Sequence, residues 1–367
     1  MTHSTVRFSK FDRADFFKTL NSRVNDYFEK NQINRYGNWK LYLKSIVVFA
    51  IFLTPYFLIM SNLFNQWVML LLTIVTGAGM SFVGMCVMHD GNHGSYSRRR
   101  WVNNLMGSSI YILAGNVYNW KVQHNVLHHT YTNIAGHDED FNTNGLIRLH
   151  KGESWRHFHK FQHYYSVLLY GLLTLNWAIR KDYRQMKEYI QRGFAFENGV
   201  NPAREWTILI LTKILYLLVW IVLPILLLDI AWWKVLIGFF AMHYTAGLIL
   251  SIIFQLAHIV EDTETPLPDN QGNMDNTWAI HQLFTTANFA PRNKLVSWFV
   301  GGLNYQIEHH IFPHISHIHY PNIAKIVKET ALEFGLPYNE YHTTRSAILS
   351  HFRMLRELGR QPALAQA

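Results

Sequence analysis

This 367-residue sequence contains three histidine-rich clusters whose residues are of a type and spacing suited to binding a metal. They read H-D-G-N-H, H-N-V-L-H-H and Q-I-E-H-H, and their members are His89, His93, His124, His128, His129, Gln306, His309 and His310. In each cluster, two of these side chains are three or four residues apart, which places them on one face of a helix. Because imidazole is the commonest metal-ligating side chain, each cluster predicts a face that holds a metal with more than one ligand.

The ligand types narrow the choice of metal. Cys86 is the only cysteine, so the sequence offers no thiolate cluster, and imidazoles alone suit zinc, iron, copper or nickel. The H-E-x-x-H motif of zinc proteases is absent, as is the E-x-x-H pair of soluble di-iron bundles. About eight imidazoles exceed what one tetrahedral zinc needs. Two irons with nearly all-nitrogen coordination fit this number, and the adjacent His128 and His129 could then serve different metals.

Four apolar segments are long enough to position these clusters at a membrane. About 20 residues cover the ~30 Å of hydrocarbon in a bilayer. The sequence reaches this length at residues 45–63, 67–88, 206–228 and 234–258. Only short turns separate the first segment from the second and the third from the fourth. We predict an all-α integral membrane protein with four transmembrane helices in two hairpins and a cytoplasmic helical cap that holds the di-iron site.

Lysine and arginine predict the orientation of these helices. Nine lie in residues 1–44, fourteen in 89–204 and eight in 259–367, whereas the hairpin turns have only Lys234 beside them. Because basic loops stay cytoplasmic, both termini and the central loop are predicted to be cytoplasmic. All three clusters then lie on one side of the membrane, which a chance scatter of histidines does not explain. The net charge of +9 suits anionic lipid headgroups, and we expect no nucleic-acid partner.

The rest of the sequence gives no sign of a second domain. We predict three parts: a cytoplasmic N-terminal segment (1–44), a membrane domain (45–350) and a C-terminal tail (351–367). The apolar stretches at 107–118 and 164–179 are too short or too interrupted to cross a bilayer and are predicted to be interfacial or re-entrant helices at the cytoplasmic face. His243, within the fourth segment, is predicted to form hydrogen bonds between helices.

The three clusters, in this order and with a long hydrophobic stretch between the second and third, resemble the histidine boxes of membrane fatty acid desaturases. The resemblance runs from about Asn38 to Pro337. It includes the residues around the boxes, H-H-T-Y-T-N-I-A-G-H-D-E-D after the second and G-G-L-N-Y-Q-I-E-H-H-I-F-P-H at the third. A third box that opens with glutamine resembles the front-end branch, in particular bacterial linoleoyl-CoA-desaturase-like proteins. Members of this branch act between an existing double bond and the carboxyl end.

The resemblance implies two iron ions held by the boxes, with dioxygen as co-substrate. It adds His258, which matches a family histidine at the cytoplasmic end of a late transmembrane helix. Some relatives place an asparagine one turn earlier to hold a metal-bound water, where this sequence has Phe254. Gln306 replaces a histidine of other branches and is expected to ligate through its amide oxygen, to bind through water or to orient His310.

Acidic residues near the boxes are expected to hold the imidazoles in place. A carboxylate that accepts the second N–H of a ligating imidazole fixes its tautomer. The candidates are Asp90, Asp138, Asp140, Glu261 and Glu308. Four further histidines are not expected to ligate, because the boxes already fill two coordination spheres: His137, His314, His317 and His319.

The function implied by the resemblance is insertion of a cis double bond into an acyl chain bound to coenzyme A or a lipid. The candidates for contact with a phosphate-bearing headgroup are Arg98–Arg100, Lys121, Arg180 and Lys181. The H-P-G-G motif of the haem domain fused to many front-end relatives is absent. We therefore expect two electrons from a separate donor, such as a ferredoxin or a cytochrome-b-type haem protein. The expected location is a bacterial inner membrane.

Two alternatives to this function remain open at this point. A membrane di-iron hydroxylase or a sphingolipid desaturase would use the same chemistry with a different outcome. A metal transporter would instead place histidines or acids along a path inside the spans, where only His243 lies deep.

Overall fold

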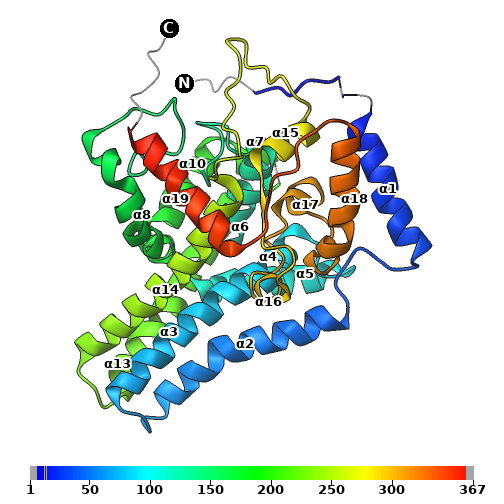
Figure 1. Ribbon diagram of the computed structural model, residues 1–367. Helices are drawn as coiled ribbons and strands as arrows, with labels where there is room; N and C mark the ends of the chain where they lie inside the picture. The colour runs from blue at the N-terminus through cyan, green and yellow to red at the C-terminus, as the bar shows by residue number, and fades with distance from the viewer. Residues whose placement is uncertain (1–5, 12, 14, 198, 361–367) are drawn as a thin grey trace. The chain divides into compact units, whose positions relative to one another are not determined.

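The computed structural model describes residues 6–11, 13, 15–197 and 199–360, and these residues are mostly helical (Figure 1). Within these ranges the only strands are β1 (Asn288–Phe289) and β2 (Glu340–Tyr341), which form one short parallel pair. Four helices are long and apolar enough to cross a membrane: Trp39–Met60, Gln66–His93, Pro202–Leu227 and Trp232–His258. The predicted all-α membrane fold with four spanning helices is confirmed.

The chain forms two compact units. The first unit consists of Met1–Tyr36, Gln123–Ser166 and Ile253–Ala367, and the second consists of Gly37–Val122 and Val167–Ile252. Three of the four passages of the chain between the units occur inside helices: η3 (Lys121–His128), α8 (Gln162–Gly171) and α14 (Trp232–His258). Each unit is described by itself below.

Asparagine side chains begin three of the spanning helices in the second unit. Asn38 accepts a hydrogen bond from the backbone N–H of Lys40 at the start of α2 (Trp39–Met60). Asn65 accepts two such bonds at the start of α3 (Gln66–Val83), and Asn201 accepts one at the start of α12 (Pro202–Leu217). These bonds satisfy backbone donors that have no partner in the first helical turn. They place the helix starts within a few residues of the apolar segments found in the sequence.

The spanning helices pack closely in two hairpins. Figure 1 shows α2 and α3 side by side, joined by residues 61–65. The side chain of Asn62 donates to the carbonyl of Leu227 and accepts from the backbone N–H of Asp229, which links the turns of the two hairpins. A Cβ atom at Gly79 would meet the backbone of Phe52 in α2. Glycine therefore allows the helix backbones to approach closely, as small residues do in membrane bundles.

Two of the spans contain π-helical turns. Helix α3 continues through the π-helix η1 (Gly84–Met88) into α4 (His89–His93). Helix α12 continues through η6 (Leu218–Val222) into α13 (Leu223–Leu227). The first histidine cluster thus lies at the end of an unbroken spanning helix, as predicted. Turns of this kind are rare and are often found at functional sites.

Short helices make up the remainder of the second unit. They are α5 (Arg100–Gly107), η2 (Ser108–Leu113), α6 (Val117–Trp120), α9 (Leu173–Asn176), η5 (Trp177–Lys181), α10 (Asp182–Gln191) and α11 (Phe194–Glu197). The stretches at 107–118 and 164–179, each expected as one interfacial helix, are divided among several of these elements and α8. His243 lies within α14, where its ring nitrogens are 2.9 Å from the Thr174 hydroxyl and 2.8 Å from the Tyr216 hydroxyl. The predicted interhelical hydrogen bonding of His243 is confirmed.

A buried ion pair that the sequence did not reveal joins three of these elements. Lys213 lies in the third span, and its side chain is only 3% exposed. Its ammonium is 2.6 Å from the carboxylate of Asp182 and also donates to the carbonyls of Ala114 and Trp177. All three ammonium donors are therefore used, which compensates for the loss of hydration.

The first unit consists of short helices. They are α1 (Phe16–Lys30), α7 (His129–Tyr131), η4 (His157–Phe161), α15 (Trp278–Thr285), α16 (Lys294–Phe299), α17 (Gln306–Ile311), η7 (His317–His319), α18 (Tyr320–Glu333) and α19 (Thr344–Arg360). Helix α1 lies beside α18 (Figure 1) and buries residues four apart: Phe16, Leu20, Val24 and Phe28. Arg23, on another face, binds the carboxylate of Glu333 at 2.6 Å.

The C-terminal helix α19 is held by a buried arginine. Arg148 is fully buried, and it donates hydrogen bonds to the carbonyls of Lys151, Glu153 and Leu358. A cation near the C-terminus of a helix satisfies carbonyls that lack partners there. The tail predicted at 351–367 begins within α19, and residues 361–367 lie outside the described residues.

We predict that Lys213→Met destabilises the protein by about 3–5 kcal/mol, because it leaves Asp182 buried without its partner. Thermal unfolding of the purified protein in detergent measures the change. The double variant Lys213→Met/Asp182→Leu is expected to recover most of the loss, because it removes both charges. Lys187→Met, at an exposed lysine of α10, is the matched control. A Lys213→Met protein as stable as this control would contradict the prediction.

Candidate metal centre

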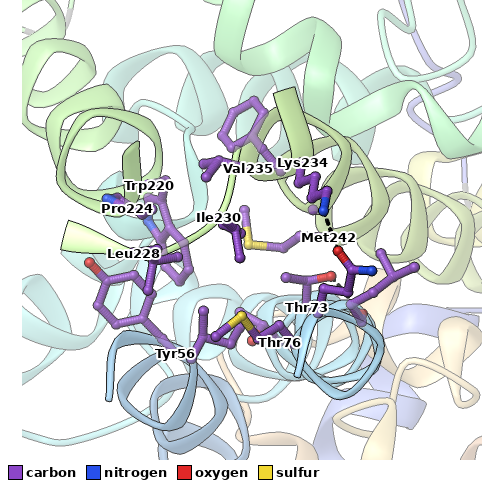
Figure 2. Close-up of a pocket in the computed structure, with 16 residues that line it drawn as sticks. Tyr56, Thr73, Thr76, Trp220, Pro224, Leu228, Ile230, Lys234, Val235 and Met242 are labelled. Carbon is purple, nitrogen blue, oxygen red and sulfur yellow. Dashed lines mark hydrogen bonds between the residues drawn. The ribbon is translucent and has the colours of Figure 1, made fainter. Parts of the chain in front are cut away.

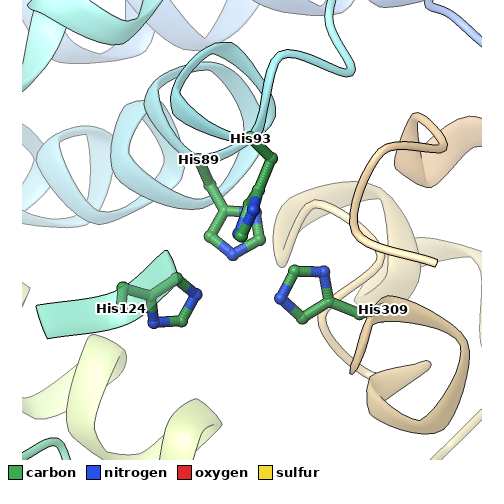
Figure 3. A group of neighbouring side chains, drawn as sticks. All are labelled: His89, His93, His124 and His309. Carbon is green, nitrogen blue, oxygen red and sulfur yellow. The ribbon is translucent and has the colours of Figure 1, made fainter. Parts of the chain in front are cut away.

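The first histidine cluster presents two rings from one helix end in the second unit. His89 and His93 project from α4 with ring centroids 4.6 Å apart (Figure 3). The half-buried Trp120 meets both rings edge-on, with centroids at 5.7 and 5.5 Å. The carboxylate of Asp90 is 4.0 Å from Nδ1 of His89, which is longer than a hydrogen bond. The predicted shared face of His89 and His93 is confirmed.

The second cluster lies on the π-helix η3 and the helix α7 that follows it. The rings of His124 and His128 stack with centroids 5.2 Å apart, so these two side chains share a face. The ring of His129 is almost perpendicular to that of His124, at an interplanar angle of 86°. The three imidazoles therefore point in two directions, so that they could bind two different metal ions, as the sequence suggested.

The third cluster lies on α17, where Gln306, His309 and His310 are all buried. A network on the opposite side of the helix fixes its position. The Asn288 side chain accepts from the backbone N–H of Ile307 and donates to the Glu308 carboxylate at 2.8 Å. The hydroxyl of Tyr338 also donates to Glu308, and burial raises the pKa of this carboxyl to about 7. The expectation that Glu308 accepts from an imidazole is therefore wrong, because Asn288 and Tyr338 occupy its oxygens.

Two groups of histidines come together within the first unit. One consists of His128, His258 and His310, and the other of His129, His309 and His310. In each group the possible ligand atoms lie within 4.8 Å of one another. They come from the second cluster, the end of α14 and the third cluster. The rings of His124 and His309, both drawn in Figure 3, are also stacked, with centroids 6.0 Å apart. Segments more than 100 residues apart in the sequence thus converge on a site of two adjoining groups.

Hydrogen-bond acceptors behind the imidazole rings determine which ring nitrogen faces the candidate metal site. Nδ1 of His128 is 2.9 Å from the Asp138 carboxylate, and Nδ1 of His124 is 3.1 Å from that of Asp140. An ionised carboxylate only accepts hydrogen bonds, so these contacts favour a proton on Nδ1 and leave Nε2 as the nitrogen that can face a metal. Asp138 and Asp140 therefore lie where their predicted role requires, and ligation by His124 and His128 stays a prediction. Glu261 lies elsewhere, 3.8 Å from Arg353 at the surface, so its predicted role is wrong.

Two further partners were missed by the sequence analysis. Nδ1 of His310 is 2.9 Å from Oε1 of Gln282, which also accepts from the Thr132 hydroxyl. Nδ1 of His309 is 3.2 Å from the hydroxyl of Tyr320. Gln282 and Tyr320 belong to no histidine cluster, and nothing in their local sequence marks them. Only the fold brings α15 and α18 behind the third cluster.

Buried nitrogens without partners show that the site suits a metal. Among the residues that the structure describes, each ring of His128, His258 and His310 has a buried nitrogen with no hydrogen-bond partner, and so does the side-chain oxygen of Gln306. Burying such polar atoms costs free energy unless a ligand satisfies them. Neutral imidazole nitrogens and an amide oxygen are suitable ligands for a divalent metal.

Phe254 packs directly against this group of rings. Its ring centroid is 5.1 Å from that of His128 and 4.7 Å from that of His258. A phenyl ring offers neither a ligand atom nor a hydrogen bond for water, so no water-mediated ligand can come from this side chain. In the described part of the chain, four other histidines belong to no such group: His137, His314, His317 and His319.

Comparison with known proteins identifies the family. The family model described as fatty acid desaturase matches residues 65–342, which include all three clusters and His258. The chain belongs to the fatty acid desaturase family. It is therefore an oxidoreductase and a membrane protein, and the alternative of a metal transporter is rejected.

Named relatives resemble this desaturase over nearly its whole length. It is 36% identical to the sn-1 linoleoyl-lipid 6-desaturase of Arthrospira platensis, over 99% of this chain and 97% of the relative. It is 33% identical to the enzyme of the same name from Synechocystis sp., over 98% and 99% of the two chains. An acyl-lipid (8-3)-desaturase of Physcomitrium patens is 31% identical, over 97% of this chain and 74% of the relative. The expected likeness to front-end desaturases is confirmed.

We predict that Asp138→Asn lowers the affinity of the candidate site for a divalent metal by about 10- to 100-fold, as loss of a partner behind a ligating imidazole does. The amide no longer requires a proton on Nδ1 of His128. Iron bound per protein is measured against a chelator. Glu261→Gln is the matched control, because this acid pairs with Arg353 at the surface. Equal iron affinities of the two variants would contradict the role of Asp138.

Gln282→Leu should weaken metal binding by a similar factor of about 10 to 100, because His310 and Thr132 lose their shared acceptor. Gln282→Glu keeps an oxygen at this position and should retain most of the affinity. The order wild type, Gln282→Glu, Gln282→Leu in a chelator titration is the expected result. Equal losses in both variants would mean that Gln282 acts only through packing.

Proposed function

We propose that this desaturase is a front-end acyl-lipid desaturase, which inserts a cis double bond between an existing double bond and the carboxyl end of a lipid-bound acyl chain. The convergence of His128, His258 and His310 with unsatisfied buried nitrogens is the observation that carries the proposal of metal-dependent chemistry. The names of the relatives, which act on linoleoyl lipid or acyl lipid, support the lipid-bound substrate.

The proposed metal centre holds two iron ions. The histidine groups of the first unit, together with His124 and Gln306, form one part of the ligand set. We propose that His89 and His93 of the second unit complete it, because the three boxes of the family occur together in this chain. The proposed ligands are thus His89, His93, His124, His128, His129, His258, Gln306, His309 and His310. Iron, when bound, supplies the oxidising chemistry with dioxygen that an unactivated methylene requires.

The residues of the chain provide orientation and a dry environment. Asp138, Asp140, Gln282 and Tyr320 hold the imidazoles in the tautomer that directs Nε2 to the metals. Most ligating side chains are less than 10% exposed, which keeps bulk water away from the reacting carbons. Methylenes are chemically alike, so the position of the acyl chain against this fixed centre must determine which bond is oxidised.

The proposed headgroup contact is the basic pair Arg100 and Lys121. Burial lowers the pKa of the Lys121 ammonium, and the nearby Arg100 lowers it further. A phosphate between two such cations would relieve both effects, which supports a phosphate-bearing headgroup here. Of the other candidates, Arg98 and Arg99 directly precede Arg100 in the sequence, whereas Arg180 and Lys181 lie in η5.

The electron donor and the orientation are also proposals. The positive net charge of +9 and the basic segments support an acidic donor, such as a ferredoxin or a cytochrome-b-type haem protein. The lysine and arginine distribution supports cytoplasmic termini in a bacterial inner membrane. A hydroxylase or sphingolipid desaturase outcome would use the same centre, and product analysis separates these from a front-end desaturase.

The test is expression of the full chain in a host that is fed linoleate and makes no further-desaturated product. We expect a new double bond on the carboxyl side of the existing ones, appearing first in intact glycerolipids during pulse labelling. His310→Ala should abolish the product. His342→Ala, at a side chain that is 78% exposed, is the control and should retain it.

Each alternative outcome has a defined meaning. Appearance of the label first in acyl-coenzyme A would contradict the lipid-bound substrate. An oxygenated chain would indicate a hydroxylase. The same product from His310→Ala would contradict the role of the third box.

A further inference from the structure

A cavity of ≈ 80 Å³ lies among the spanning helices of the second unit and is partly open to the outside (Figure 2). Its lining comes from the ends of α2, α3, α13 and α14 and from the turn before α14. Most of the lining is apolar and includes Ile59, Met69, Leu228 and Val235, which also pack together as a buried cluster. Neither the metal centre nor the proposed headgroup contact uses this cavity.

The cavity lies at the end of the spans away from the first histidine cluster. Gln66, which lines it, and His89 belong to one continuous helix of the second unit. At 1.5 Å per residue, the 23 residues between them correspond to about 35 Å. Trp67, Trp232 and Trp233 are 73%, 60% and 49% exposed near the same helix starts. Indole rings favour the membrane interface, so the polar edge of the cavity lies at the level of lipid headgroups.

Lys234 stands at this polar edge. It is the only lysine or arginine in residues 45–88 and 214–258. Its ammonium donates to the side-chain oxygen of Gln66 in an exposed hydrogen bond, drawn as the dashed line in Figure 2. An ammonium has three donors, so two remain for an anionic partner. The acid of the same turn, Asp229, uses its backbone N–H to bind Asn62.

We propose that this cavity receives a short segment of one acyl chain of a bound anionic phospholipid, whose remainder lies in the surrounding bilayer and whose phosphate is held by Lys234. An apolar cavity is a poor site for water, and at this depth the surrounding lipid supplies acyl chains at high concentration. The lone cation at interface level selects an anionic headgroup. The edge of the cavity at Gln66 and Lys234 lies about 35 Å from His89 along the continuous helix Gln66–His93. A lipid whose headgroup is held at this edge is distinct from the substrate, and the proposal does not depend on the proposed function.

The headgroup is tested with purified full-length protein in nanodiscs of equal parts phosphatidylglycerol and phosphatidylcholine. Native mass spectrometry then counts the lipids retained after release. One retained lipid is expected, with phosphatidylglycerol favoured about fivefold, the preference that one lysine near a headgroup provides. Lys234→Gln should abolish this preference. Lys40→Gln, at an exposed lysine of α2, should keep it. An unchanged preference in Lys234→Gln would overturn the proposal.

The acyl chain is tested by filling the cavity. Val235→Phe places a ring in the space and should abolish retention of either lipid. Ile237→Phe, at a position 49% exposed on the same helix, is the matched control and should retain it. Thr73→Leu, on the opposite wall, replaces Val235→Phe if that variant does not fold. Retention in the filled variant would overturn the proposal, as would a change in its fatty acid products, because the occupant would then be the substrate chain.

Discussion

The centre depends on keeping many imidazoles buried, neutral and correctly oriented at the same time. An imidazole removed from water loses the stabilisation of its charged form, and burial lowers the pKa of His310 well below its usual value. Neutral rings can ligate, but only if the protonated nitrogen is on the far side. Asp138, Asp140, Gln282 and Tyr320 supply acceptors on that side. The first unit must therefore position the hydrogen-bond acceptors behind the imidazoles as accurately as it positions the imidazoles themselves.

The helix backbone must also orient the imidazoles correctly. A regular α-helix that leaves a membrane continues in one direction, and its side chains follow a fixed period. Here π-helical turns precede or contain the first two clusters: η1 leads into His89, and η3 carries His124 and His128. A wider turn adds a residue without ending the hydrogen-bonded helix, so it changes the direction of the following side chains while the backbone groups stay satisfied. This explains how a rigid spanning helix can present ligands at its end.

The sequence predicted the ligands far better than it predicted their supports. The clusters and the four spans follow from spacing and hydropathy, which are local properties, whereas His258 came from the resemblance to the desaturase family. Asp138 and Asp140 were found because they are close to the second cluster in sequence. Gln282 and Tyr320 were missed, and Glu261 and Glu308 were misassigned, because which side of a ligand a residue approaches depends on tertiary packing. Lys213 was also missed, since its partners Ala114, Trp177 and Asp182 lie far away in the sequence.

Lys213 and Lys234 illustrate two ways in which charge is tolerated in a membrane. Lys213 is enclosed by protein and has an acid and two carbonyls for its three donors. Lys234 stands at a helix start beside exposed tryptophans and has only Gln66 as a hydrogen-bond partner among the described residues. Burial without a full set of partners is costly, so the second lysine must gain the rest of its stabilisation from the interface. A structural cation can therefore be identified by protein acceptors that use all of its N–H donors. A lipid-binding cation can be identified by N–H donors that remain available to lipid headgroups.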